Sequence, residues 1–230
     1  MHGVSRRDAS DGDGQLERAL VALPIFPLPD TVFFPHTLLP LHVFEPRYRQ
    51  LTEQVLASHM HIGVVCIDES RDDVSVKGVA RVSGVGRVVH HERLADGRFH
   101  ILLQGLARAE LVEELPLEGL LYRRATAKLL CPGGEPLEPE TDAEVQTLRS
   151  CYARLLEVCP DTKDVLGDLP LRVQEPRVLA DVVCAAILDD VAARQAALEE
   201  TSVARRLRCA NDALANLLLQ GLATDSGGMH

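Results

Sequence analysis

The stretch from Leu23 to Tyr48 constrains the fold of this chain more than any other part of the sequence. It contains two short apolar runs, Leu23–Leu28 and Thr37–Val43, separated by a proline-bracketed link, and the second run predicts a strand around Leu38–Val43. The second run leads into Pro46, and proline is well suited to the first turn of a helix. Four of the chain's five phenylalanines lie in this stretch, although aromatic residues make up only 3% of the sequence. Large rings dominate the energetics of protein cores, so this stretch predicts the first folding core.

The sequence that follows has the pattern of a curled β-sheet. After a helix predicted from Pro46 to about Ala57, the continuous apolar run Ile62–Ile67 is typical of a buried strand. Gly84 and Gly86 interrupt the strand pattern of Gly78–His91, and glycine inside a strand marks a bulge or a sharp bend. Six or seven short strands with one inserted helix predict a small closed or half-open β-barrel.

One hairpin within this sheet can be placed from the sequence. Asp96-Gly97 is typical of a two-residue turn between antiparallel strands. In the strand that returns from the turn, Phe99, Ile101 and Leu103 are expected to point to one face and His100 and Gln104 to the other. Gly105 is then expected to break this strand before it continues.

The apolar period changes from two to 3.6 after the proline- and glycine-rich segment 131–136. The predicted helices are Thr141–Val158, Asp161–Leu166, Glu175–Leu188, Asp190–Glu199 and Thr201–Leu219. Thr141 and Glu144 match a capping box at the start of the first of these helices. Gly221 is expected to end the last helix. The basic cluster Arg205–Arg208 on that helix is expected to face solvent.

The predicted fold class is therefore α+β, with a small pseudo-β-barrel followed by a C-terminal helical bundle. The expected domain organisation is a flexible leader at 1–19, a β-barrel subdomain at 20–131, a linker at 132–139, a helical subdomain at 140–220 and a flexible tail at 221–230.

Composition and charge exclude several classes of protein. The net charge of −10 argues against binding to duplex DNA, which favours a concentrated basic surface. The sequence has no apolar run of about 18 residues, so no membrane span is expected, and its start lacks the apolar core of a secretion signal. The six cysteines include no C-x-x-C pair, which predicts reduced, mostly buried thiols and a cytoplasmic protein.

No catalytic signature is found in the sequence. The phosphate-binding loop G-x-x-x-x-G-K-[ST] and the nucleophile motif G-x-S-x-G are both absent. His91-Glu92 lacks the second histidine of H-E-x-x-H, and adjacent His90 and His91 would point to opposite faces of a strand. We therefore predict no catalytic, metal-binding or cofactor-binding residues and no enzymatic activity.

Three ordered patches resemble one known family. They are the stretch Leu23 to Tyr48, the hairpin arm Gly97–Arg108 and the helical segment Pro176–Leu207. Together, over residues 20–215, they resemble the Lon substrate-binding domain, which is the N-terminal domain of the ATP-dependent Lon protease and also occurs in bacteria as a protein of its own. The resemblance implies a PUA-like pseudo-barrel and a recognition module without the ATPase and peptidase domains.

The function expected from this resemblance is non-catalytic binding of unfolded or degron-bearing polypeptides in connection with proteolysis, with a protease or chaperone as a further candidate partner. A groove between barrel and helices would accept an apolar segment. The Phe33-Phe34 link has two interpretations, a solvent-facing apolar lip that captures unfolded segments or two rings that belong to the core. The core is favoured, because alternation alone should bury at least one of the rings. Arg47 is expected to pair with a carboxylate across the barrel. The candidate polypeptide-binding residues are Phe33, Phe34, Pro35, His36, Arg47 and Tyr48.

The alternative function is that of an RNA- or small-ligand-binding PUA-like module. The nearly neutral charge of the front half of the chain argues against this alternative, because neutralisation of phosphates supplies most of such affinity. The observation in its favour is a set of arginines on neighbouring predicted strands, namely Arg81, Arg87, Arg93, Arg98 and Arg108.

Overall fold

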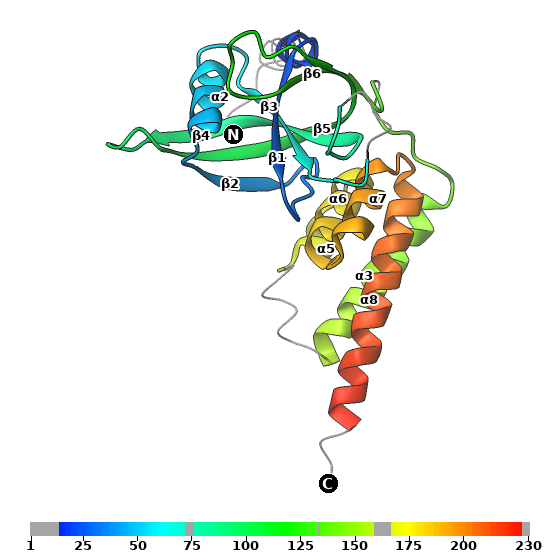
Figure 1. The fold of residues 1–230 in the computed structure, drawn as a ribbon. Coiled ribbons are helices and arrows are strands. Elements are labelled where there is room, and N and C mark those ends of the chain that lie inside the picture. Colours follow the sequence, from blue (N-terminus) through cyan, green and yellow to red (C-terminus); the bar gives the residue numbers. More distant parts are fainter. Residues whose placement is uncertain (1–13, 72–75, 133, 159–166, 227–230) are drawn as a thin grey trace, which may run out of the picture. The chain divides into compact units, whose positions relative to one another are not determined.

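The computed structural model describes residues 14–71, 76–132, 134–158 and 167–226 (Figure 1). The chain divides into two compact units, Met1–Leu130 and Cys131–His230. The predicted helix Asp161–Leu166 and residues 1–13 and 227–230 of the predicted leader and tail lie outside the described residues. Within the described ranges, no helix is both long and apolar enough to cross a lipid bilayer.

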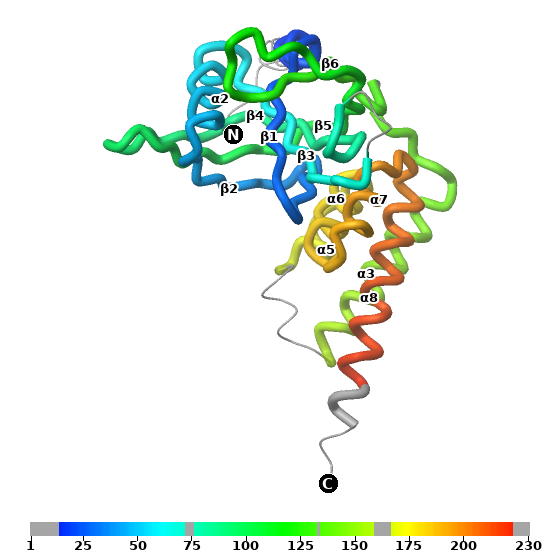
Figure 2. Tube along the Cα trace, viewed as in Figure 1, coloured from blue at the N-terminus to red at the C-terminus, as the bar shows by residue number. Residues whose placement is uncertain are grey.

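The first unit is a mixed six-stranded sheet with one inserted helix, which confirms the predicted class. The strand order is β2-β5-β4-β3-β1-β6, and an additional pairing between β5 and β6 closes five of the strands into a ring with β2 on its flank (Figure 2). β1 and β3 run parallel, whereas the other pairs are antiparallel. The elements are β1 (Leu23–Leu28), β2 (Leu38–Val43), α2 (Pro46–Leu56), β3 (His61–Cys66), β4 (Val82–Arg93), β5 (Phe99–Leu115) and β6 (Arg124–Leu129).

The break predicted at Gly105 is a shift in strand pairing, and the strand itself continues beyond it as expected. β5 continues from Phe99 to Leu115, and the register with β4 shifts where Gly86 faces Gly105 and Val85 faces Ala107. The bulge expected from the glycines is therefore present, because one extra residue of β5 is accommodated here. It separates the half of β5 that pairs with β2 from the half that pairs with β6.

The hairpin between β4 and β5 has a longer loop than predicted. The N–H of Gly97 donates to the carbonyl of Leu94, the N–H of Leu94 donates to the carbonyl of Arg98, and Gly97 has a φ of 80°. Asp96 is not among the residues with positive φ, which a two-residue type I′ turn would require. The connection is therefore a three-residue loop with a left-handed glycine at its end.

Helix α2 supplies one side of the core of the first unit. Pro46 occupies the first turn as predicted, and the buried face of the helix carries Tyr48, Leu51 and Val55 at three- and four-residue spacing. These side chains belong to one buried cluster with residues from β1, β3, β4 and β5. The cluster includes Phe26, Phe33, Ile62, Val64, Val88, Phe99, Ile101 and Leu103.

The first unit begins before residue 20. Residues 14–20 form a helix, and the side chains of Ala19 and Leu20 are buried. Burial of these two apolar side chains explains why the last part of the predicted leader is ordered.

The second unit contains helices α3 (Thr141–Val158), α5 (Leu169–Arg172), α6 (Pro176–Ile187), α7 (Val191–Glu199) and α8 (Val203–Ser226). Helix α8 packs against both α3 and α6. It does not end at Gly221 as predicted but continues to Ser226. Asp190 is the N-cap of α7, because its carboxylate accepts a hydrogen bond from the N–H of Ala193 at 2.9 Å.

The predicted capping box at the start of α3 is replaced by other contacts. The hydroxyl of Thr141 donates to the carboxylate of Glu138 at 3.2 Å. The carboxylate of Glu144 instead accepts from Arg208 and Asn211, each at 2.9 Å. Glu144 therefore joins α3 to α8, a role that local spacing could not reveal.

The expected solvated basic face on α8 is wrong for Arg206. This guanidinium is fully buried, with Nε 3.1 Å from Oδ1 of Asp181, and it also pairs with the carboxylate of Glu135. A further N–H donates to the carbonyl of Glu200 at 2.8 Å. A charge without solvent needs such partners, so Arg206 organises the interior of the second unit.

The expectation of mostly buried thiols is also wrong for the described cysteines. Cys66 and Cys184 are buried, whereas Cys131 and Cys151 are partly exposed and Cys209 is exposed. Cys159 lies outside the described residues.

Candidate functional site

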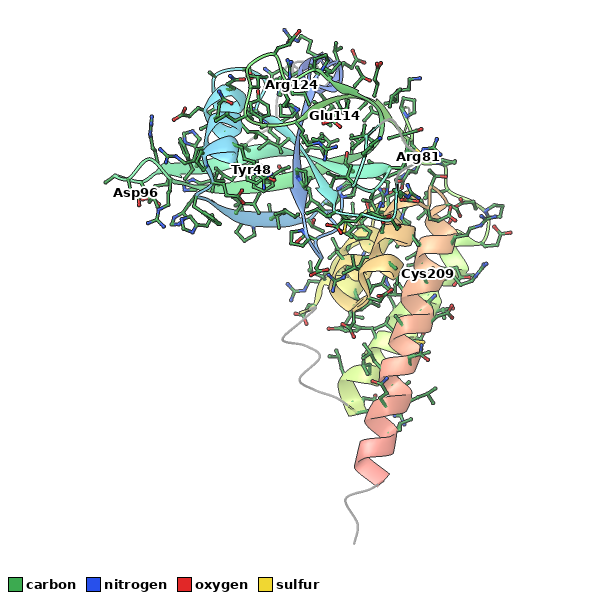
Figure 3. All side chains as sticks on the ribbon, in the orientation of Figure 1. Tyr48, Arg81, Asp96, Glu114, Arg124 and Cys209 are labelled. Atoms are coloured by element: carbon green, nitrogen blue, oxygen red, sulfur yellow. The ribbon has the colours of Figure 1, made fainter. Side chains whose placement is uncertain are left out.

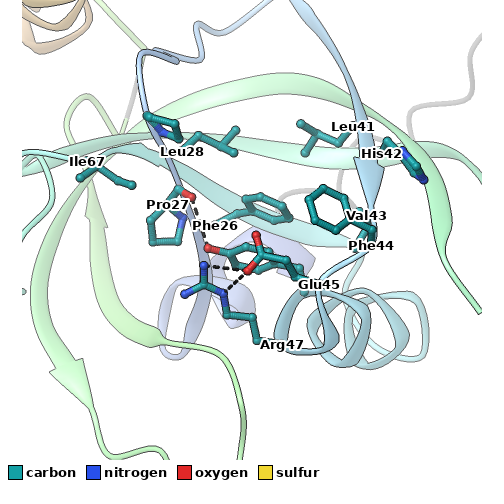
Figure 4. A pocket seen from close by; sticks show the side chains of 12 residues that line it. Phe26, Pro27, Leu28, Leu41, His42, Val43, Phe44, Glu45, Arg47 and Ile67 are labelled. Carbon is teal, nitrogen blue, oxygen red and sulfur yellow. Dashed lines mark hydrogen bonds and ion pairs between the residues drawn. The ribbon is translucent and has the colours of Figure 1, made fainter.

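The first unit has an apolar pocket of about 250 Å³ between β1, β2 and the start of α2 (Figure 4). The pocket is called the β1–β2 pocket below. Its inner wall is formed by aromatic and aliphatic side chains, and its polar lining comes from a few residues near its mouth. The lining residues are Phe26, Pro27, Leu28, Pro29, Leu41, His42, Val43, Phe44, Glu45, Arg47, Tyr48 and Ile67.

Local sequence explains how these side chains reach one place. In β2, Val43 is buried and His42 is exposed, as expected for the alternation of a strand with one buried face. The chain then turns into α2 at Pro46, which has no N–H and so suits a helix start. β1 and β2 follow each other in the sequence but are not paired in the sheet. The pocket lies between them, and residues at the start of α2 form part of its wall.

Tyr48 forms the floor of the pocket. Its ring stacks on Phe26 with 3.9 Å between ring centroids and an interplanar angle of 15°. Its hydroxyl donates to the carbonyl of Pro27 at 3.3 Å. Burial raises the pKa of the Tyr48 phenol, so the hydroxyl stays protonated and keeps donating at neutral pH. Tyr48 therefore connects β1 to α2 and contributes apolar surface to the site.

Arg47 lies at the mouth of the pocket, and its partner is not the one predicted. Its guanidinium contacts the carboxylate of neighbouring Glu45 at 2.9 Å, not a carboxylate across the barrel (Figure 4). The Cζ atom of Arg47 also lies 4.5 Å from the centroid of the Tyr48 ring. Both charged side chains are exposed, so this ion pair contributes little to stability.

The apolar rim of the pocket is exposed. Phe44 has 60% of its surface accessible and Ile67 has 40%. Phe44 follows the buried residue Val43 directly, so the alternation of β2 directs it outward. Exposed apolar side chains that border an apolar pocket are typical of a binding surface.

The solvent-facing Phe33-Phe34 lip is wrong. Phe33 is 3% exposed and Phe34 is fully buried, so the interpretation that both rings belong to the core is correct. The link lies against glycines of the sheet: a Cβ at Gly84 would be 1.9 Å from the Phe33 carbonyl oxygen, and one at Gly105 would be 2.1 Å from that of Phe34. The strand glycines thus permit a close backbone approach in addition to the bulge.

The six predicted site residues divide into three groups. Phe33, Phe34 and Pro35 are buried in the link. His36 is exposed and has a φ of 64°, but it does not line the pocket. Arg47 and Tyr48 do line it. Phe44 and Ile67 were missed, although the alternation of β2 could have identified Phe44 as exposed.

The arginines proposed for RNA binding are mostly neutralised. Arg81 pairs with Glu110, Arg93 with Glu53 and Arg98 with Asp96. Figure 3 labels Arg81 and Asp96 among the side chains of the first unit. Arg108 is buried.

In the part of the chain that the structure describes, no group of three or more His, Cys, Asp or Glu side chains has a geometry that could hold a metal ion.

The family model of the ATP-dependent protease La (LON) substrate-binding domain matches residues 22–216. The chain is 23% identical over 198 residues to the Lon protease of Desulfosudis oleivorans and 28% identical over 187 residues to that of Rhizobium meliloti. These matches cover 85% and 80% of this chain but 24% and 23% of the two proteases. The chain thus spans about a quarter of the length of the curated relatives that it matches.

Solved structures of Lon N-terminal domains have the same fold. The N-terminal domain of the Mycobacterium avium complex Lon protease superimposes with a TM-score of 0.67 at 18% identity, over 85% of this chain and 98% of that domain. A Lon N-terminal domain protein from Xanthomonas campestris gives a TM-score of 0.59 at 20% identity, over 81% and 95%. The family match extends through both units, from β1 into α8, and the chain belongs to the Lon substrate-binding domain family.

Proposed function

We propose that this chain binds polypeptide segments that expose bulky apolar side chains, and that it recognises these segments without cleaving them. The observation that carries the proposal is the β1–β2 pocket with its exposed rim of Phe44 and Ile67. The family name, a substrate-binding domain, supports the same role. The family match covers only that domain of the Lon proteases, so their ATP hydrolysis and peptide cleavage are not part of the proposal.

The size of the pocket favours a polypeptide side chain over a small-molecule ligand. Its volume of about 250 Å³ is below the range of roughly 300–1,000 Å³ that is usual for drug-sized ligands. Burial of one large apolar side chain contributes about 1.5–3 kcal/mol. Such a gain corresponds to weak binding, which suits recognition of many unfolded sequences and requires additional contacts along the bound chain.

The proposed biological context is protein degradation. The matched relatives are Lon proteases, in which this domain accompanies about three quarters of additional chain. We infer that the protein delivers unfolded or degron-bearing polypeptides to a protease or chaperone, or regulates such a partner, in the cytoplasm.

The alternative of RNA binding receives less support. Three of the five arginines proposed for it already pair with carboxylates, so they offer little unneutralised positive charge to phosphates. A fluorescence-anisotropy titration with structured RNA at low salt is expected to give no change in signal.

Binding can be tested with a labelled, permanently unfolded protein such as reduced and carboxymethylated α-lactalbumin. The wild-type chain is expected to bind it, and the exposed-rim variants Phe44→Ser and Ile67→Ser are expected to weaken binding at least threefold each. Leu121→Ser is the matched control, because Leu121 is 58% exposed but does not line the pocket. Variants of Phe33 or Phe34 are unsuitable, since these rings are buried. A wild-type chain that does not bind above background would refute the proposal.

A further inference from the structure

The outer edge of β2 is unpaired beside the β1–β2 pocket. β2 pairs with β5 on one side, and no other strand of the described residues pairs with it. The carbonyl of Thr37 accepts from the N–H of Gly105 at 2.9 Å, which places Thr37 toward β5. Alternate residues of a strand direct their N–H and C=O groups to opposite edges. The backbone groups of Leu38, Pro40 and His42 are therefore directed to the outer edge.

Pro40 provides a second argument for this orientation. It pairs with Leu102 in the middle of the β2–β5 ladder without interrupting the register. Proline has no N–H, so within a strand it is tolerated where the missing donor would face away from the ladder. The outer edge of β2 thus has carbonyl groups at all three positions and N–H groups at Leu38 and His42.

The opposite wall of the pocket has no comparable free edge. Ile67 donates its N–H to the carbonyl of Leu28, so Leu28 faces β3 and Pro27 faces away from it. Pro27 has no N–H, and its carbonyl already accepts the hydroxyl hydrogen of Tyr48. Within the described residues, β2 is therefore the side of the pocket with main-chain groups available to a ligand.

We propose that an extended polypeptide segment binds here as an added strand. Its main chain hydrogen-bonds to Leu38, Pro40 and His42, and one apolar side chain enters the β1–β2 pocket. This inference rests on the proposed function and specifies the binding mode of the same site. It also supplies the additional contacts that a single buried side chain lacks, because pairing with a strand edge provides affinity that does not depend on sequence.

The side chains around His42 define the chemistry of the segment. His42 faces His100 across β2 and β5, with 4.9 Å between ring centroids, and Nδ1 of His100 lies 3.6 Å from Oε2 of Glu92 on β4. The residue of the added strand that pairs with His42 has its side chain on the same face of the sheet as His42, His100 and Glu92, and it extends this row of side chains by one strand. An acidic side chain there places a carboxylate beside the imidazole of His42, as Glu92 does for His100.

The neighbouring residue of the added strand points to the other face, where Leu41 and Val43 line the pocket. The favoured ligand is therefore an extended segment in which a bulky apolar residue is flanked by acidic residues. A suitable probe is the labelled peptide acetyl-Thr-Val-Glu-Leu-Glu-Val-Thr-amide. Replacement of both glutamates by lysine is expected to weaken its binding at least threefold.

The decisive measurement is amide hydrogen exchange by NMR. In the free protein, the amides of Leu38 and His42 are expected to exchange rapidly, whereas Leu39 and Leu41, which face β5, are protected. Saturation with the peptide is expected to protect Leu38 and His42 specifically. Saturating peptide that leaves both amides unprotected would overturn the proposed mode.

Two matched protein variants separate the main chain from the side chain. His42→Pro removes the outward N–H and leaves the ladder to β5 intact, so the peptide is expected to bind about tenfold more weakly. His42→Thr retains the N–H and is expected to bind within about threefold of the wild type. Equal binding by His42→Pro and His42→Thr would contradict the strand-addition mode.

The outcomes also distinguish this inference from the proposed function. If unfolded polypeptide binds and Phe44→Ser weakens it, but Leu38 and His42 stay unprotected, the proposed function stands and the strand-addition mode fails. If neither the unfolded protein nor the peptide binds, both are refuted.

Discussion

Substitution of Gly105 by alanine should destabilise the first unit, because the Phe33-Phe34 link lies directly over this glycine. An added Cβ would be 2.1 Å from the carbonyl oxygen of Phe34 and 3.1 Å from Cα of Pro35. Ordinary van der Waals contacts of a Cβ are 3.4–4 Å. The backbone of the link would therefore have to move by more than about 1 Å, since no flexible side chain can yield in its place.

The magnitude follows from the contacts that this movement affects. Overpacking of a dense core costs about 1–3 kcal/mol. The hydrogen bonds from His36 N–H to the Gly105 carbonyl and from Gly105 N–H to the Thr37 carbonyl, both 2.9 Å, attach the link to β5. Their loss would add about 0.5–1.5 kcal/mol each. We expect the free energy of unfolding to fall by about 3–5 kcal/mol, which is a large fraction of the usual 5–15 kcal/mol.

The assay is urea denaturation of Gly105→Ala and the wild type, followed by far-UV circular dichroism. Because the chain has two compact units, hydrogen exchange of residues 30–43 should be measured in parallel to localise the change. Gly14→Ala is the control, since an added Cβ at Gly14 has no neighbour within 4 Å and should change stability by less than about 0.5 kcal/mol. A Gly105→Ala protein as stable as this control would refute the argument.

Three further predictions concern pH, a buried charge and a helix cap. Burial lowers the pKa of His61 from 6.5 to about 4. Between pH 6.5 and pH 4, His61 is therefore protonated in the unfolded chain but neutral in the folded chain. The free energy of unfolding should therefore fall by about 3 kcal/mol as pH decreases from 6.5 to 4, and His61→Gln should remove most of this dependence in pH-dependent urea titrations. Arg206→Met removes the guanidinium that pairs with the buried carboxylate of Asp181 and should cost about 3–5 kcal/mol by urea denaturation, whereas Arg208→Met on the exposed face should cost less than about 1 kcal/mol. Asp190→Ala removes the N-cap of α7 and should lower the free energy of unfolding by about 1 kcal/mol, while Asp190→Asn should largely restore it.

The sequence by itself determined the elements whose signals are local. β1 and β2 have the predicted bounds Leu23–Leu28 and Leu38–Val43, and α3 has the predicted bounds Thr141–Val158. Pro46 marked the start of α2 because proline fixes the backbone and removes an N–H within one residue. Motifs spread over the chain also resembled the correct family, and the family match at residues 22–216 bears this out.

Tertiary structure decided which side chains are available to a ligand. Two adjacent phenylalanines, Phe33 and Phe34, are consistent in sequence with an exposed binding surface. In the structure their backbone lies against Gly84 and Gly105 of the sheet, and both rings are buried. Arg206 belongs to a basic run in the sequence, yet Asp181 and Glu135, far from it along the chain, hold it inside the second unit. Local patterns fix backbone conformation over a few residues, whereas burial and charge pairing depend on partners that only the folded chain brings together.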